Sequence, residues 1–203
     1  MNDIDIETVK KRYSDRYKQF GYSPETLGWG KNGRQELRFS ILTQIGDLNE
    51  KSILDVGCGF GDLCGYVMSK GLSCEYTGID IVPDLIEEGK QRFPHGEYIL
   101  GDFDTHSFDK QFDYIIASGI FNFKLLSESN TGYIRRMLRK MIQCSKHGVA
   151  VDFMSIYVDY QHPIAFHTNP ASVLDIALKT TNKFVIRQDY MPYEYSLYLY
   201  PRW

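Results

Sequence analysis

The stretch that decides the fold is residues 51–63, Lys-Ser-Ile-Leu-Asp-Val-Gly-Cys-Gly-Phe-Gly-Asp-Leu. An apolar run broken by one acidic residue meets a glycine at every second position, and an apolar-periodic segment follows. This pattern predicts a strand, a tight turn and a helix. A turn that lets a ligand touch its backbone cannot carry Cβ atoms there, and the helix start offers unpaired N–H groups. The stretch therefore predicts a cofactor-binding loop.

The spacing of the glycines excludes two common cofactor loops. The dinucleotide fingerprint needs a small residue at position 62, where Asp62 would place a carboxylate against the pyrophosphate. A Walker loop needs a Gly-Lys-Ser/Thr sequence, which does not follow here. The loop is thus predicted to bind a different kind of cofactor.

The arrangement Asp55-x-Gly57-x-Gly59-x-Gly61 resembles the first motif of the class I S-adenosylmethionine-dependent methyltransferases. In that family the glycine turn holds the methionine portion of the cofactor, and the strand acid lies beneath its ammonium. The alternative is a sterically required turn that binds no ligand. The ends of the next three predicted strands favour the first interpretation.

Each of these strands ends in residues that extend the resemblance. Asp80 ends a strand about 20 residues after the middle glycine, where a carboxylate can accept both ribose hydroxyls; an ordinary helix cap is the alternative. Asp102 and Phe103 match positions that bond the adenine amino group and pack on its ring in the family. The turn at 118–123 follows the fourth strand and is expected to face the reactive end of the cofactor.

The succession of elements predicts an α/β fold. Five strands alternate with helices, and a closing pair of strands near the C-terminus is antiparallel because its connection is too short for a crossover. We expect a doubly wound, seven-stranded, mostly parallel sheet with one antiparallel strand near the C-terminus, helices on both faces and an N-terminal helical lid. Residues 1–50 are predicted to form the lid and residues 51–203 the methyltransferase domain, within one compact domain overall.

Three helices are predicted in enough detail to be tested. The first covers residues 4–20, with Asp3 or Asp5 as its cap, and another covers residues 131–146. A third starts at Asn169-Pro170. Its inward residues are predicted to be Val173, Leu174, Ala177 and Leu178.

Composition limits the partners. The net charge of -3 gives no electrostatic footprint for nucleic acid, and we read the basic run at 135–140 as a solvated helix face. No apolar run is long enough for a membrane helix and no signal peptide is evident, so we expect a cytoplasmic protein without a membrane partner. The four cysteines form no C-x-x-C pair, so we expect reduced thiols and no metal site.

The irregular segment at 154–169 follows a strand and is predicted to wall the acceptor pocket. For each histidine in it, a surface position is the alternative. Aromatic side chains such as Tyr13, Tyr17 or Phe121 can stabilise the sulfonium. The acceptor-side candidates are His162, His167, Asp159 and Tyr157. The predicted cofactor-binding residues are Asp55, Gly57, Cys58, Gly59, Asp80, Ile81, Asp102, Phe103, Ser118, Gly119, Trp29, Gly30, Arg34 and Arg38.

The resemblance implies an S-adenosylmethionine-dependent methyltransferase, with S-adenosylhomocysteine as product. We expect in-line transfer to an oxygen or nitrogen atom of a small-molecule acceptor, a sugar-like molecule among the options. An oxygen acceptor benefits from a general base, whereas a neutral amine needs less help. Two alternatives stay open: a nucleic-acid or protein methyltransferase, and a cofactor-binding partner protein without transferase activity.

Overall fold

The computed structural model describes residues 1–29 and 34–202. Its strands are β1 (Ser52–Val56), β2 (Glu75–Asp80), β3 (Glu97–Leu100), β4 (Phe112–Ala117), β5 (Ser145–Met154), β6 (Phe184–Arg187) and β7 (Glu194–Leu199). Its helices are α1 (Asp3–Phe20), α2 (Gln35–Leu42), the short 3-10 helix η1 (Thr43–Ile45), α3 (Asp62–Ser69), α4 (Pro83–Arg92), α5 (Asn130–Cys144) and α6 (Pro170–Thr180).

The seven strands form one sheet in the order β3-β2-β1-β4-β5-β7-β6. The first five run parallel, and β7 pairs antiparallel with both β5 and β6. The predicted sheet with one reversed strand is thereby confirmed. The order reverses between β1 and β4, and in open α/β sheets a crevice forms at this switch point, beyond the carboxyl ends of the strands.

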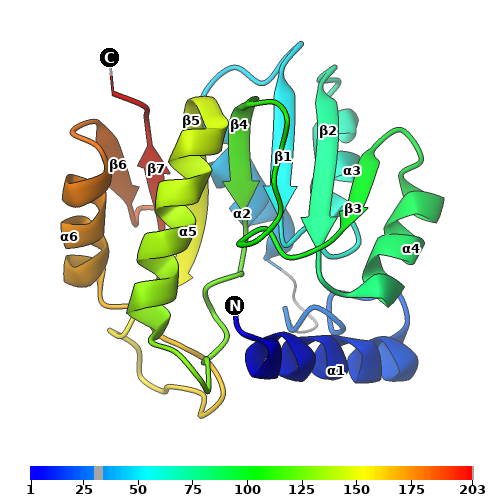
Figure 1. Ribbon diagram of the computed structural model, residues 1–203, viewed down its shortest axis with the longest axis horizontal. Coiled ribbons are helices and arrows are strands. Elements are labelled where there is room, and N and C mark those ends of the chain that lie inside the picture. Colours follow the sequence, from blue (N-terminus) through cyan, green and yellow to red (C-terminus); the bar gives the residue numbers. More distant parts are fainter. Residues whose placement is uncertain (30–33, 203) are drawn as a thin grey trace.

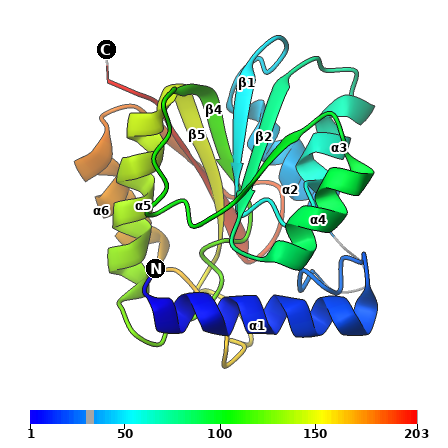
Figure 2. The same cartoon turned by 45° about the vertical axis from the view of Figure 1, so that its right-hand side comes forward.

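Helices cover both faces of the sheet, as Figure 2 shows for α5 and α6 on one side and α3 and α4 on the other. Alternate residues of each strand supply the two cores. Leu54 of β1 belongs to the core under α5 and α6, whereas its neighbour Ile53 belongs to the core under α2 and α3. Strands buried on both faces require continuous apolar sequence, which explains the near-uniform hydrophobicity of β1 and β4.

The connection from β3 to β4 differs from the expected alternation of strands and helices. Residues 101–111 contain turns but no helix. Aromatic packing fills the space instead, since the Phe108 ring lies 5.9 Å from that of Phe103 and 5.4 Å from that of Phe112. This face of the sheet is thus covered by side chains of a loop and by α5.

Helix α1 lies across the end of the sheet to which the parallel strands point (Figure 1). Asn2 caps it, accepting a hydrogen bond from the Asp5 backbone N–H, so the predicted Asp3 or Asp5 cap is wrong. Asp5 is instead fully buried and accepts hydrogen bonds from the Leu126 N–H, at 2.7 Å, and from Ser127. At the other end of the helix, the Tyr17 hydroxyl donates to Glu88 of α4 over 2.6 Å. Both ends of α1 are therefore fastened to the sheet domain.

Helix α6 begins after Asn169, as predicted, but its buried face differs from the predicted one. Leu174 and Leu178 are exposed, and Ile176 is buried beside Val173. Helix α5 ends at Cys144 and passes directly into β5, two residues before the predicted end. Within residues 1–29 and 34–202, no helix has the length and apolar character needed to cross a membrane.

Substitutions at Ile176 and Leu178 make a matched test of which face of α6 is buried. We expect Ile176→Ala to lower the free energy of unfolding by about 2–5 kcal/mol, because it leaves a cavity in the core. Leu178→Ala removes a side chain that is 58% exposed, and we expect it to stay within about 0.5 kcal/mol of wild type. Urea unfolding of both variants measures the difference; equal losses would contradict this orientation of α6.

Candidate active site

A cavity of about 690 Å³ lies at the carboxyl ends of the parallel strands, with α1 contributing to its wall. All but two of the predicted cofactor-binding residues line it. Arg34 is exposed just before α2 and does not line it, and Gly30 lies outside the described residues. The predicted residues that line it are Trp29, Arg38, Asp55, Gly57, Cys58, Gly59, Asp80, Ile81, Asp102, Phe103, Ser118 and Gly119.

The turn after β1 has the geometry expected of a Cβ-free loop. Gly57 adopts a φ of +70° and donates its N–H to the Ile79 carbonyl over 2.8 Å. A Cβ at this position would collide with the Ile120 side chain. Backbone therefore forms this part of the cavity wall, and Ile120 packs directly above it.

Asp55 lies at the end of β1 and is 5% exposed. Its carboxylate accepts a hydrogen bond from the Tyr76 hydroxyl over 2.7 Å. Burial raises the pKa of Asp55 to about 7, although the Tyr76 bond acts in the opposite direction. A cationic group in the cavity would find a carboxylate here that ionises readily beside it.

Asp80 binds the glycine turn and the start of α4 together. One carboxylate oxygen accepts the Gly59 N–H and the other accepts the Val82 N–H, both over 2.9 Å. Val82 is the N-cap residue of α4, so the alternative interpretation of Asp80 as that cap is wrong. Each carboxylate oxygen retains a lone pair for a further donor in the cavity.

Asp102 and Phe103 lie at the end of β3. The Asp102 carboxylate is 2.9 Å from the ammonium of Met1, which also contacts Asp104 at 2.9 Å. Phe103 is 3% exposed and packs in the main core while it lines the cavity. The predicted pair thus flanks the same end of the cavity.

Arg38, in the middle of α2, lines the cavity. Its guanidinium forms two hydrogen bonds to Glu194 of β7, one of them from Nε over 2.7 Å, and lies 4.2 Å from the Trp29 ring centre. The third nitrogen, Nη1, is buried and has no hydrogen-bond partner among residues 1–29 and 34–202. Buried unpaired donors are costly, so this atom fits an anionic group of a ligand.

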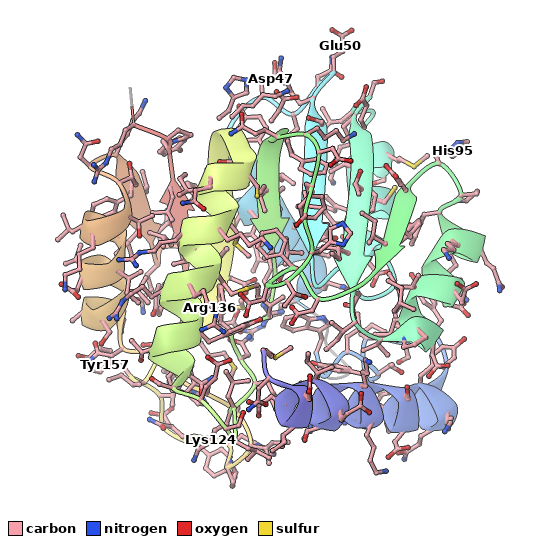
Figure 3. All side chains as sticks on the ribbon, in the orientation of Figure 1. Asp47, Glu50, His95, Lys124, Arg136 and Tyr157 are labelled. Carbon is pink, nitrogen blue, oxygen red and sulfur yellow. The ribbon has the colours of Figure 1, made fainter. Side chains whose placement is uncertain are left out.

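The acceptor-side candidates separate into two pairs. His162 and His167 line the cavity, whereas Tyr157 and Asp159 do not. Tyr157 is 66% exposed, at the same end of the molecule as α1 (Figure 3). Asp159 is exposed and accepts the Tyr193 hydroxyl over 2.7 Å.

Only one of the three suggested aromatic residues reaches the cavity. Tyr13 lines it, and Tyr17 does not. Phe121 is 1% exposed and stacks on Phe153, because the turn after β4 directs Ile120 rather than Phe121 toward the cavity. Sequence reasoning missed two polar residues at the site, Asp152 and Glu194. Asp152 lies in the predicted fifth strand, and Glu194 lies in the connection predicted between the two closing strands. The pairing of β5 with β4 brings Asp152 to the turn at 118–119, and the pairing of β7 with β5 brings Glu194 to the cavity.

Comparison with known proteins gives consistent results. A family described as "Methyltransferase domain" matches residues 53–148. The Mycobacterium tuberculosis protein Rv1506c is 29% identical over 154 residues, which are 72% of this chain and 90% of that protein. The Thermotoga maritima demethylmenaquinone methyltransferase is 33% identical over 88 residues, or 42% of this chain and 38% of that enzyme. These matches support a class I S-adenosylmethionine-dependent methyltransferase.

The fold of this methyltransferase is also found in solved structures. Magnesium protoporphyrin IX methyltransferase from Synechocystis, crystallised with S-adenosylhomocysteine, superimposes with a TM-score of 0.72 at 14% identity. The match covers 98% of this chain and all of that one. The cofactor of the present protein is S-adenosylmethionine, and two observations fit it: Gly57 and Gly59 line the cavity with backbone, and Arg38 Nη1 is an unpaired buried donor.

The raised pKa of Asp55 makes the stability of this methyltransferase depend on pH. Its value of about 7 in the folded chain, against about 3.9 in an unfolded one, means that folding favours the protonated carboxyl. This stabilisation is complete below about pH 3.9 and is lost as pH rises through about 7. We expect Asp55→Asn, which keeps an oxygen for the Tyr76 hydroxyl, to remove this part of the pH dependence.

Urea unfolding of the wild type and Asp55→Asn between about pH 4 and pH 8 measures this effect. The two free-energy curves should approach each other on acidification and separate toward alkaline pH in favour of the variant. Parallel curves would show that Asp55 titrates as an ordinary surface carboxyl.

Proposed function

We propose that this methyltransferase transfers a methyl group to an oxygen atom of a small-molecule acceptor, with His167 as the general base. The observation that carries the proposal is the hydrogen bond between His167 Nδ1 and the Ser155 carbonyl oxygen, at 2.9 Å. A carbonyl can only accept, so Nδ1 holds the proton and Nε2 of the neutral ring is a free acceptor. His167 lines the cavity, which gives this base access to an acceptor hydroxyl.

His162 has the opposite tautomer. Its Nδ1 accepts the Ile164 backbone N–H over 3.4 Å, so its Nε2 holds the proton in the neutral ring. The side chain is exposed and lines the cavity. We assign His162 to acceptor binding rather than to proton abstraction.

The cofactor-facing roles follow from the positions of the polar groups. We propose that Asp80 accepts the ribose hydroxyls, that Asp55 lies beneath the cofactor ammonium and that Arg38 Nη1 donates to its carboxylate. Asp102 and Phe103 would flank the adenine. Each of these groups lines the same cavity, so one bound molecule can reach them all.

The chemistry depends mainly on alignment. S-adenosylmethionine supplies an electrophilic methyl group on its sulfonium, and the protein holds the acceptor oxygen in line with it. Such positioning is worth about 7–11 kcal/mol of the barrier in well-oriented systems. Removal of the acceptor proton by His167 adds about 10²–10⁴-fold in rate.

A small acceptor is supported by the shape and charge of the protein. The cavity of about 690 Å³ falls within the range of about 300–1,000 Å³ usual for small-molecule sites. Apolar side chains such as Ile120, Phe123 and Met154 contribute to its lining, and the net charge is -3. The Thermotoga and Synechocystis proteins named above are, by their names, methyltransferases of demethylmenaquinone and of magnesium protoporphyrin IX, which are small molecules.

Calorimetric titration with S-adenosylhomocysteine tests the cofactor site. We expect Asp80→Ala to weaken binding at least about tenfold, or about 1.4 kcal/mol, because the ribose hydroxyls lose their acceptor. Asp84→Ala is the matched control, since that carboxylate lies four residues further on and does not line the cavity. Equal affinity in wild type and Asp80→Ala would remove the ribose assignment.

Incubation with methyl-labelled S-adenosylmethionine and a cell extract tests the acceptor and the base together. We expect label in the fraction that passes an ultrafiltration membrane, and a rate about 100-fold lower in His167→Gln, with unchanged affinity for S-adenosylhomocysteine. His162→Gln should raise KM more than it lowers kcat. Label retained with nuclease- or protease-sensitive material would instead support a macromolecular acceptor, and full activity of His167→Gln would exclude it as the base.

A further inference from the structure

A buried carboxylate at the end of β5 holds the turn that follows β4. Asp152 is 2% exposed. It accepts the Ser118 hydroxyl over 2.5 Å through one oxygen and the Gly119 N–H over 2.7 Å through the other. Both oxygens are thus used on two consecutive residues of the cavity wall.

The held turn supports the tryptophan beside it. Gly119 has a φ of +77°, and a Cβ on it would lie 2.5 Å from Cη2 of Trp29. The indole therefore packs directly on the Gly119 backbone, and its face lies against the Arg38 guanidinium. A change in the turn would move the indole, because no side chain separates them.

The charges around Asp152 fit a structural carboxylate that stays within this network. Arg38 on α2 attracts its charge, whereas Glu194 on β7 repels it. Tyr190, which precedes β7, is a further titratable group that interacts electrostatically with all three. Desolvation outweighs the favourable contacts and raises the pKa of Asp152 to about 6. Burying a carboxylate costs desolvation free energy, and its hydrogen bonds can offset this cost while they fix the geometry of the turn that they hold.

We propose that Asp152 is a positioning residue for the methionine end of the cofactor: by holding Ser118 and Gly119, it fixes the Trp29 indole and thereby the shape of that cavity wall. The proposal rests on the cofactor site described under Proposed function. Asp152 itself does not line the cavity, so it acts through Gly119 and Trp29 rather than by contact.

The opposite end of the sheet provides a matched control. Asp113 of β4 likewise accepts one backbone N–H and one hydroxyl, both from Ser52, over 2.9 and 2.7 Å. It is also partly buried, but it lies at the amino end of β1, away from the cavity. Loss of Asp113 removes a similar pair of hydrogen bonds, together with an ion pair to Lys146, without touching the proposed network.

The experiment combines calorimetry with fluorescence in a Trp203→Phe parent, where Trp29 is the single tryptophan of the chain. We expect Asp152→Ala to weaken S-adenosylhomocysteine binding at least tenfold and to shift the Trp29 emission to longer wavelength. Asp113→Ala should bind within twofold of the parent with unchanged emission, although both substitutions lower the melting temperature. Asp152→Asn keeps an oxygen for the Gly119 N–H and should recover most of the lost affinity.

The outcomes separate this proposal from the cofactor assignment. If the parent binds S-adenosylhomocysteine and Asp152→Ala does so equally well, the positioning role is overturned and the cofactor site stands. The positioning role is also overturned if Asp113→Ala weakens S-adenosylhomocysteine binding as much as Asp152→Ala does, or if Asp152→Asn recovers none of the lost affinity. If the parent fails to bind, both proposals fall. If Asp152→Ala does not fold, Ser118→Ala tests the proposal instead. We expect it to weaken S-adenosylhomocysteine binding about threefold and to shift the Trp29 emission less.

Discussion

The packing of Ile120 on the Gly57 backbone, in the turn after β1, is the contact on which the rest of the site depends. A Cβ on Gly57 would collide with Cγ2 of Ile120, so a glycine there lets the turns after β1 and β4 meet at the cavity wall. The turn after β1 lies where the strand order reverses, between β1 and β4, so neighbouring loops diverge and leave a crevice. The parallel strands then deliver Asp80, Asp102 and Ser118 to the same edge, because all their carboxyl ends point one way.

The carboxylates buried around the crevice lower the folding stability of the protein. Asp55 and Asp152 both have raised pKa values because burial outweighs their hydrogen bonds. Such groups lower stability near neutral pH, yet each fixes something that a ligand would need: a counter-charge in one case and a turn in the other. Stability and function are thus opposed at this edge of the sheet, as is common in sites whose polar groups are arranged before the ligand arrives.

Closure of the crevice depends on segments distant in sequence. Helix α1 crosses the strand ends because Asp5 binds the backbone after β4 and Tyr17 binds α4. The segment at 154–169 is held from the other side, where Ser155 donates its N–H to the Tyr193 carbonyl over 2.8 Å. This arrangement closes the cavity with groups from both ends of the chain.

The sequence by itself determined the elements whose signals are local. The seven-stranded sheet with one antiparallel strand matches the prediction, and the cofactor-side residues at the ends of β1 to β4 lie together, because strand, turn and helix patterns depend on residues adjacent in sequence. The tertiary structure alone decided the rest. The face of α6 and the cap of α1 depend on what each helix packs against, and Leu178 and Asp5 satisfy the periodic pattern equally well in more than one orientation. Asp152 meets Ser118 and Gly119 because β5 pairs with β4, and Glu194 reaches the cavity because β7 pairs antiparallel with β5. The free nitrogen of His167 follows from its hydrogen bond to the Ser155 carbonyl. Local patterns fix which elements form, whereas long-range pairing fixes which polar atoms meet, because those contacts join residues that no short-range periodicity relates.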